Sequence, residues 1–200
     1  MVDSPQAGDN NYVEVSAFPY IDGIFVPDGG GGPVKVSSAG HIFTDCPDTN
    51  NQFWAGITNY EKVANGNGFM DLHPMRLGRR NFGTTSHPGL FLHANIGVTF
   101  DLETIRLSLP GTTIKSFTAQ CGIGDTTAAT AKADFWVLVD GQVRFFSKGM
   151  RPGDIPKTVY VELKEQDRFL TLLTTDSDGN NGNDWCIFAM PGLQLKERDR

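Results

Sequence analysis

Apolar and polar residues alternate in short runs along the second half of the chain, which is the pattern of half-buried β-strands. Residues 102–109 differ, because Leu102, Ile105 and Leu109 fall near one face of a helix that Pro110 ends. Short strands with Gly, Asn and Asp turns between them indicate an antiparallel β-sandwich. The strands are predicted at 90–94, 97–102, 114–121, 133–139, 142–147, 157–163, 168–174 and 185–188.

The first part of the chain has shorter and less regular patterns. Residues 12–18 alternate apolar and polar positions and predict a strand, and residues 21–26 predict another. A glycine-rich turn at 27–33 follows, so we expect a hairpin between 21–26 and a strand at 34–37. Residues 44–89 are irregular, and a connection of this length in a compact domain is typical of segments that bind ligands or act as lids.

These patterns divide the chain into four parts. Residues 1–11 are polar and predict a disordered segment, and residues 196–200 form a polar tail. The regular strands from residue 90 onward form the sandwich. Residues 12–76 add N-terminal strands and long loops to that sandwich, because their apolar runs are too short to fill a core alone. The expected fold is all-β, with one short helix.

Charge and composition narrow the range of functions. The chain has 200 residues, a formal net charge of −6 and a pI of about 5.1. An acidic surface repels phosphate backbones, so we expect no nucleic-acid partner. The absence of an apolar run of about 18 residues predicts no membrane span. Arg76, Arg79 and Arg80 cluster in the sequence, and so small a cluster in a loop is ordinarily a solvated patch.

The reactive residues form no recognisable zinc or catalytic motif. The cysteines Cys46, Cys121 and Cys186 include no CxxC pair. Cys121 and Cys186 are expected to be buried thiols, or a disulfide if their strands are neighbours. The chain has no G-x-S-x-G, no carboxylate pair stands out, and the adjacency of Ser86 and His87 is not the geometry of a triad. We therefore expect a protein that is not an enzyme.

Several short phrases in the second half follow one another in the order of a known family. They run from about Leu77 to Leu195, and their order makes the match more specific than any one phrase. The phrases are Leu77-Gly78 with His93-Ala94, Val98 to Leu102, Phe117 to Gly122 with Asp125, Phe135 to Gly141, Leu170 to Asp176, and Asn183-Asp184-Trp185. The stretch resembles the NPCBM family of carbohydrate-binding modules, which is akin to family 51 of such modules. The whole chain, with Gly23 to Gly29 before that stretch, is similar to the C-terminal part of FecR-like envelope proteins of planctomycete-type bacteria.

The resemblance implies a jelly-roll, galactose-binding-like sandwich over residues 77–195 and a non-catalytic module that binds polysaccharide. Sugar sites combine an aromatic face with planar amide or carboxylate groups. Two positions depart from the family pattern, since Thr126 replaces an acidic residue and the stretch from Asn181 to Asp184 lacks a histidine. The alternative is a structural or protein-interaction module of a FecR-like envelope regulator, which contacts envelope proteins and binds no sugar. The residues expected to bind the ligand are Trp54, His93, Asn95, Asp125, Asn183, Asp184 and Trp185.

The loop at 176–184 is the most polar stretch of the chain. Oxygen ligands at Asp176, Asp178 and Asn180, joined by Asp184, predict a site for a hard cation such as calcium. The loop lacks the glycine and glutamate of an EF-hand, so this site would be of another kind. The alternative is a solvated turn built from Asn, Asp and Gly.

The start of the chain bears on location. Residues 1–10 lack the basic and apolar regions of a signal peptide. The polar start and the charged end resemble linkers, which favours a module excised from a longer exported protein. We therefore expect a periplasmic or extracellular location.

Overall fold

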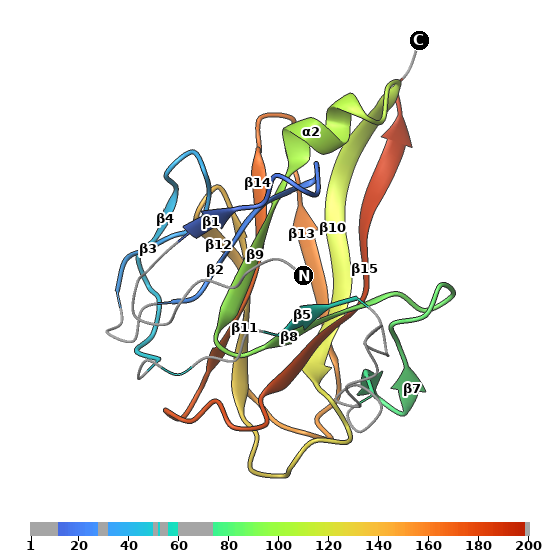
Figure 1. Cartoon of the computed structure of the whole chain (residues 1–200). Coiled ribbons are helices and arrows are strands. Elements are labelled where there is room, and N and C mark those ends of the chain that lie inside the picture. Colours follow the sequence, from blue (N-terminus) through green and yellow to red (C-terminus); the bar gives the residue numbers. More distant parts are fainter. Residues whose placement is uncertain (1–11, 28–31, 50–51, 53–55, 60–73, 199–200) are drawn as a thin grey trace.

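The computed structural model describes residues 12–27, 32–49, 52, 56–59 and 74–198 as two facing antiparallel sheets (Figure 1). The predicted disordered segment 1–11 and the candidate ligand residue Trp54 lie outside these residues. The six-stranded sheet has the order β1-β2-β9-β14-β11-β12, and the five-stranded sheet has the order β13-β10-β15-β8-β5. The predicted all-β sandwich is confirmed.

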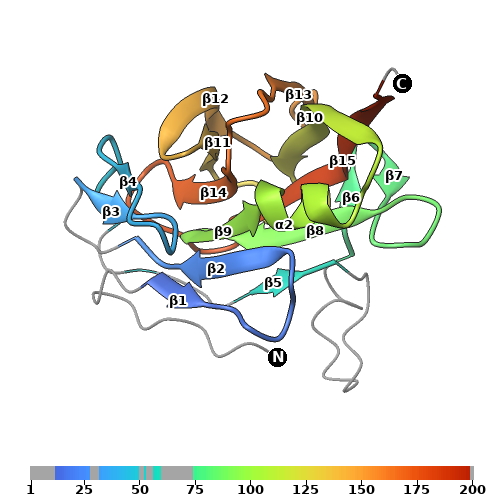
Figure 2. The ribbon, with the colours of Figure 1, turned by 90° about the horizontal axis from the view of Figure 1, so that it is seen from above.

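The strands of the six-stranded sheet are β1 (Tyr12–Glu14), β2 (Ile21–Phe25), β9 (Ile96–Asp101), β14 (Phe169–Asp176), β11 (Ala133–Val139) and β12 (Gln142–Met150). Those of the five-stranded sheet are β13 (Lys157–Glu162), β10 (Thr112–Ile123), β15 (Trp185–Glu197), β8 (Gly89–His93) and β5 (Ile57–Thr58). Two short hairpins pair β3 (Val34–Lys35) with β4 (Ile42–Phe43), and β6 (Arg76–Leu77) with β7 (Arg80–Asn81). The predicted helix is α2 (Leu102–Leu107), which lies across one end of the sandwich (Figure 2).

The main core lies between the two sheets, and two smaller apolar clusters lie on their outer faces. All seven residues of β11 are buried because both of its faces are covered. Phe135 and Val137 face the main core, whereas Trp136 and Leu138 lie in the cluster that also holds Phe43 of β4. This double covering explains why residues 135–139 of β11 are a continuous apolar run in the sequence.

The outer cluster of the five-stranded sheet has a similar origin. Its residues are Met75, Leu77, Phe82, Phe91, Trp185, Ile187 and Ala189. The first three come from the segment that contains the β6–β7 hairpin, and the others come from β8 and β15. The segment before β8 therefore covers an apolar part of that sheet face.

Two sequence predictions about turns had different outcomes. Asp140 and Gly141 join β11 to β12 with φ angles of 49° and 78°, so the predicted tight hairpin is confirmed. The hairpin predicted across the glycine-rich turn is wrong, since β3 pairs with β4 instead. The reason is that both edges of β2 are occupied, one by β1 and the other by β9.

The three cysteines are buried. Cys121 on β10 and Cys186 on β15 lie on neighbouring strands, but Cys121 is opposite Phe188 and Cys186 is opposite Ile123. The two thiols are therefore offset by two positions in the register. Burial raises the pKa of the Cys121 thiol to about 12, which keeps it protonated and unreactive.

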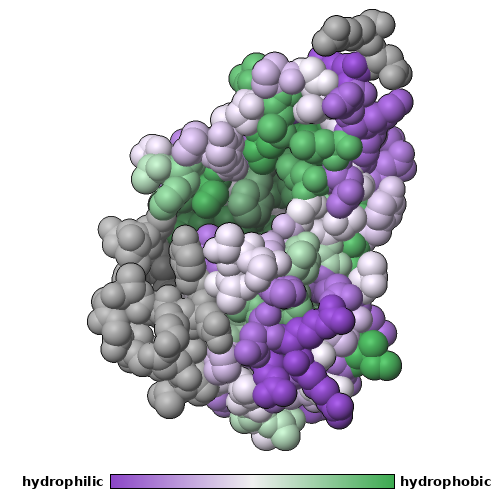
Figure 3. Space-filling view, turned by 90° about the vertical axis from the view of Figure 1, so that its right-hand side faces the viewer, coloured by the Kyte–Doolittle hydropathy of each residue, from purple (hydrophilic) through white to green (hydrophobic). Residues whose placement is uncertain are grey.

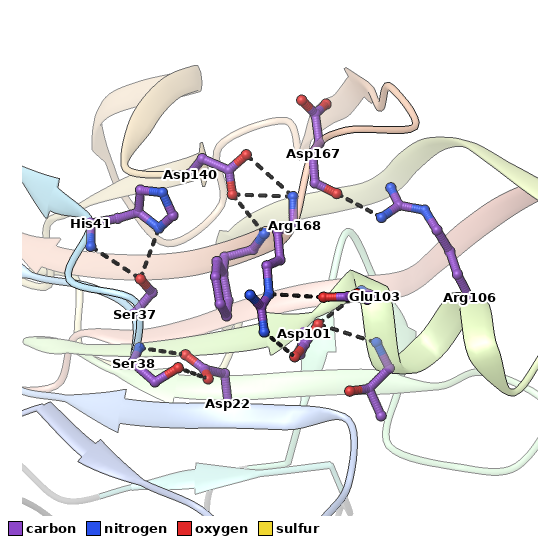
Figure 4. A network of polar contacts seen from close by, with 12 residues as sticks. Asp22, Ser37, Ser38, His41, Asp101, Glu103, Arg106, Asp140, Asp167 and Arg168 are labelled. Atoms are coloured by element: carbon purple, nitrogen blue, oxygen red, sulfur yellow. Dashed lines mark hydrogen bonds and ion pairs between the residues drawn. The ribbon is translucent and has the colours of Figure 1, made fainter.

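Polar side chains near α2 form contacts within the N-terminal part and, separately, between the strand ends around the helix (Figure 4). The Asp22 carboxylate accepts hydrogen bonds from the Ser38 backbone N–H at 2.8 Å and from the Ser38 hydroxyl at 2.5 Å. The Asp101 carboxylate caps α2 and lies 3.7 Å from the Arg168 guanidinium. Asp140 accepts from the Phe169 N–H at 2.8 Å. Strands β1 and β2 are part of the sandwich because β2 pairs with β9 and β1 pairs with β2.

Candidate functional site

Three loops meet at the end of the sandwich opposite α2 (Figure 1). They are the β8–β9 turn at 94–95, the β10–β11 loop at 124–132 and the β14–β15 loop at 177–184. Backbone hydrogen bonds join them, from Ala94 N–H to the Asp184 carbonyl at 3.1 Å and from Gly124 N–H to the Trp185 carbonyl at 2.9 Å. The predicted ligand residues that the structure describes therefore lie at this end of the sandwich.

Asn95 is the centre of a buried polar cluster beneath these loops. Its side-chain amide donates to the Asp176 carboxylate and to the Gln52 carbonyl, both at 2.8 Å, and its side-chain oxygen accepts from the Asp176 N–H at 2.6 Å. The other Asp176 oxygen accepts from the Gly179 N–H at 2.7 Å. Asn95 is fully buried, so it holds the loops in place and its amide is not exposed to a ligand.

Asp184 is a buried carboxylate in the same cluster. One oxygen accepts from the Lys132 N–H at 2.8 Å, and the other has no hydrogen-bond partner among the described residues. Burial, together with the negative charges of Asp178, Asp176 and Asp134, raises the pKa of Asp184 from 3.8 to about 7. The group is therefore close to half-protonated near neutral pH.

His93 and Trp185 are also buried, with exposed fractions of 3% and 6%. The His93 Nδ1–H donates to the Ala94 carbonyl at 2.7 Å, and burial lowers the pKa of the imidazole. Trp185 packs in the outer cluster of the five-stranded sheet. For His93, Asn95, Asp184 and Trp185 the structure therefore indicates a supporting position beneath the loops, because their side chains have almost no exposed surface.

Four amide side chains lie at this end of the sandwich. Asn180 and Asn183 are exposed, and Asn181 and Gln52 are half-buried. Asn181 is fixed by hydrogen bonds at 3.0 Å from its side-chain amide to the Ala94 carbonyl and from its backbone N–H to the Gln52 side-chain oxygen. We call these four residues the amide rim. Gln52 and Asn181 were not predicted as site residues, because 129 positions separate the two partners in the sequence.

Asp125 connects the rim to the β6–β7 hairpin. Its carboxylate accepts from the backbone N–H groups of Gly78 at 3.2 Å and Arg79 at 2.8 Å, and it lies 3.9 Å from the Arg76 guanidinium. Its own N–H donates to the Arg76 carbonyl at 2.7 Å. Asp125 therefore fixes the hairpin turn, and the hairpin brings three arginines to the edge of the loop region.

The four residues predicted to bind calcium do not converge. Both Asp176 oxygens accept hydrogen bonds, the Asn180 oxygen accepts from the Gly182 N–H at 3.0 Å, and Asp178 is exposed. Calcium needs six to eight oxygen ligands. Within the described part of the chain, no group of three or more His, Cys, Asp or Glu side chains is arranged to hold a metal ion.

A hollow of about 250 Å³ lies at the other end of the molecule, between the β1–β2 turn and β9. Its lining includes Val15, Phe18 and Ile21, with carboxylates from Asp22 and Asp101. These two carboxylates already accept hydrogen bonds from Ser38 and from the start of α2.

No helix in the described residues is long and apolar enough to cross a membrane.

Two facing antiparallel sheets with polar loops gathered at one end define a β-sandwich module of the type found among carbohydrate-binding modules. A family 51 module (CBM51) from Clostridium perfringens, solved with methyl-galactose, superposes with a TM-score of 0.55 at 20% identity over 72% of this chain and 90% of that one. A C. perfringens ZmpB structure containing two CBM51 domains gives 0.53 at 23% identity over 71% of this chain and 14% of that one. These similarities show the fold.

The family itself is shown by sequence. The NPCBM/NEW2 domain matches residues 47–194, and this chain belongs to that family, as the sequence resemblance predicted. A curated protein of Renibacterium salmoninarum that carries the name of an endo-alpha-N-acetylgalactosaminidase is 33% identical over 116 residues. The match covers 58% of this chain but only 7% of that protein, so it concerns one module of a much larger polypeptide.

Proposed function

We propose that this chain is a non-catalytic carbohydrate-binding module and that the amide rim is its contact surface for a glycan. The observation that carries the proposal is a group of exposed and half-buried amides held over a buried, hydrogen-bonded cluster, in a chain of the NPCBM family. Side-chain amides both donate and accept hydrogen bonds, as sugar hydroxyls require. A surface already fixed before binding loses less conformational entropy on association.

An aromatic side chain that stacks on a sugar in this site must be one other than Trp136 or Trp185. Trp185 and Trp136 are buried, with 6% and 8% of their surface exposed, and a sugar ring needs an open aromatic face. Trp54 lies outside the described residues and stays a predicted ligand residue. Hydrolysis of a glycoside needs two carboxylates on either side of the bond, whereas Asp176 and Asp184 are buried, which supports a binding role alone.

A glycan array with the whole chain tests this proposal. Asn183→Gly removes an amide at a residue with a φ of 67°, a conformation that glycine adopts without strain. We expect this variant to lose roughly tenfold in affinity, the effect of one or two hydrogen bonds. Gln142→Ala removes an exposed amide at the start of β12 and serves as the matched control.

The array also separates the alternatives. If the chain binds no glycan, the proposal fails, and a structural or protein-interaction module of a FecR-like envelope regulator becomes the better hypothesis. If both variants bind as the original does, the module binds sugar elsewhere. Because polysaccharides of this kind lie outside the cytoplasm, the proposal includes a periplasmic or extracellular location.

Calcium stays a prediction with its own test. Thermal melts in millimolar calcium and in a chelator are compared, because an ion that binds only the folded state raises its stability. The free oxygen of Asp184 is the described group best able to gain from a cation. A midpoint that is the same in both buffers contradicts the calcium prediction and leaves the proposed glycan site unaffected.

A further inference from the structure

We propose that the β6–β7 hairpin makes this module selective for anionic glycans, with Arg79 and Arg80 binding a carboxylate or sulfate group of the sugar chain. The inference rests on the proposed function and adds the chemical class of the ligand.

The hairpin is a local concentration of positive charge on an acidic protein. The chain has a formal net charge of −6, yet the six residues from Arg76 to Asn81 contain three arginines and no acid. Figure 3 shows strongly hydrophilic side chains gathered on the lower half of the face where this hairpin lies. Such a patch attracts an anionic polymer that the rest of the surface repels.

Two of the three arginines are available to a ligand. Arg76 lies 3.9 Å from the Asp125 carboxylate, which partly neutralises it. Arg79 and Arg80 are exposed, and within the described part of the chain their side chains form no ion pair or hydrogen bond. A free guanidinium binds a carboxylate or sulfate through two parallel hydrogen bonds, a geometry that a neutral hydroxyl does not match.

The hairpin turn places an arginine where another residue would be less strained. Gly78 and Arg79 have φ angles of 57° and 68°, the conformation of a type I′ turn, which favours glycine at its second position. Asp125 compensates by accepting hydrogen bonds from both N–H groups. A strained residue held by its surroundings is grounds for a functional hypothesis about its side chain.

One loop joins the hairpin to the amide rim. The Asp125 N–H donates to the Arg76 carbonyl at 2.7 Å, and the Thr127 hydroxyl donates to the Asn183 carbonyl at 2.6 Å. The loop 124–127 thus bonds to the hairpin at one end and to the rim at the other. Beneath the hairpin, Leu77 is buried in the outer apolar cluster. One glycan chain can therefore contact amides and arginines that the fold holds at fixed positions.

Matched pairs of polymers test this selectivity. Binding of the whole chain is measured by isothermal calorimetry with dextran sulfate against dextran, and with polygalacturonate against its methyl ester. The two pairs distinguish sulfate from carboxylate as the group recognised. We expect the charged member of at least one pair to bind at least tenfold more tightly, and Arg79→Gln or Arg80→Gln to remove roughly tenfold of that affinity each.

Two further variants keep the result interpretable. Arg79→Gly relieves the strained turn, so its thermal midpoint stays equal or rises while its affinity for the anionic polymer falls. Arg144→Gln with Lys115→Gln removes two exposed charges elsewhere and should leave at least half of the affinity.

Equal binding to the charged and neutral members of both pairs overturns the inference but leaves the proposed function intact. The inference is also overturned if the control double variant loses as much affinity as Arg79→Gln with Arg80→Gln, because the attraction is then diffuse. If the chain binds no polymer and no glycan on the array, the proposed function itself has failed.

Discussion

Replacing Asp184 with asparagine should make the protein more stable at high pH and change little at low pH. The folded state holds the Asp184 proton up to about pH 7, whereas the ordinary pKa of this carboxyl is 3.8. The folded state therefore binds this proton more tightly than the unfolded chain does. As the pH rises from about 4 through 7, this group lowers the free energy of unfolding.

The size of the effect follows from the two pKa values. A change from 3.8 to about 7 corresponds to about 4 kcal/mol, at roughly 1.36 kcal/mol for each pKa unit. The asparagine side chain stays neutral, and its oxygen can still accept from the Lys132 N–H. We therefore expect the free energy of unfolding of Asp184→Asn, relative to that of the original protein, to increase by about 2–4 kcal/mol as the pH rises from 4.5 to 8.

Urea unfolding of both proteins at several pH values in chelator measures this difference. Glu162→Gln is the control, because it removes an exposed carboxylate on β13 that is not among the charges acting on Asp184. A difference between Asp184→Asn and the original that does not change with pH would refute the reasoning. If calcium binds at Asp184, millimolar calcium will reverse the order at pH 8, since the carboxylate then has a charged partner.

Three other substitutions test the packing, each by urea unfolding. Asn95→Ala should cost about 2–4 kcal/mol, because it leaves the buried Asp176 groups without their partners; a cost under about 1 kcal/mol would contradict the role of Asn95. Gly97→Ala should cost about 1–3 kcal/mol, because the added methyl group clashes with the Phe25 ring. An unchanged stability would contradict the packing of β2 on β9. Trp136→Ala should cost about 3–5 kcal/mol and leave glycan affinity unchanged.

The strands of the sandwich could be predicted from sequence because period-two alternation is a local signal. The boundaries of β11 match the predicted range, and its apolar run reflects burial on both faces. The pairing of β2 could not be predicted, because its partner β9 lies far along the chain. The glycine-rich turn favoured a local hairpin, but β2 pairs with the edge of β9, which is distant in the sequence.

The sequence indicated which loops hold the polar candidate residues, but it did not indicate which of these side chains are buried. Asn95 and Asp184 were predicted to contact ligand because sugar sites use planar amide and carboxylate groups. Both are fully buried, since their hydrogen-bond partners come from other loops. Asn95 and Asp176 are 81 positions apart, and nothing in the sequence indicates that they meet.

Residues that precede the family match cover β9 and Trp136, and this affects how the module should be expressed. A gene fragment begun at residue 47 would code for the matched region but not for Phe25, Val34 or Phe43, which pack with Trp136. It would also leave the hydrogen-bonding edge of β9 open. An open edge beside a bare apolar patch promotes aggregation. The cloning boundary should therefore follow the sheet and begin before Tyr12.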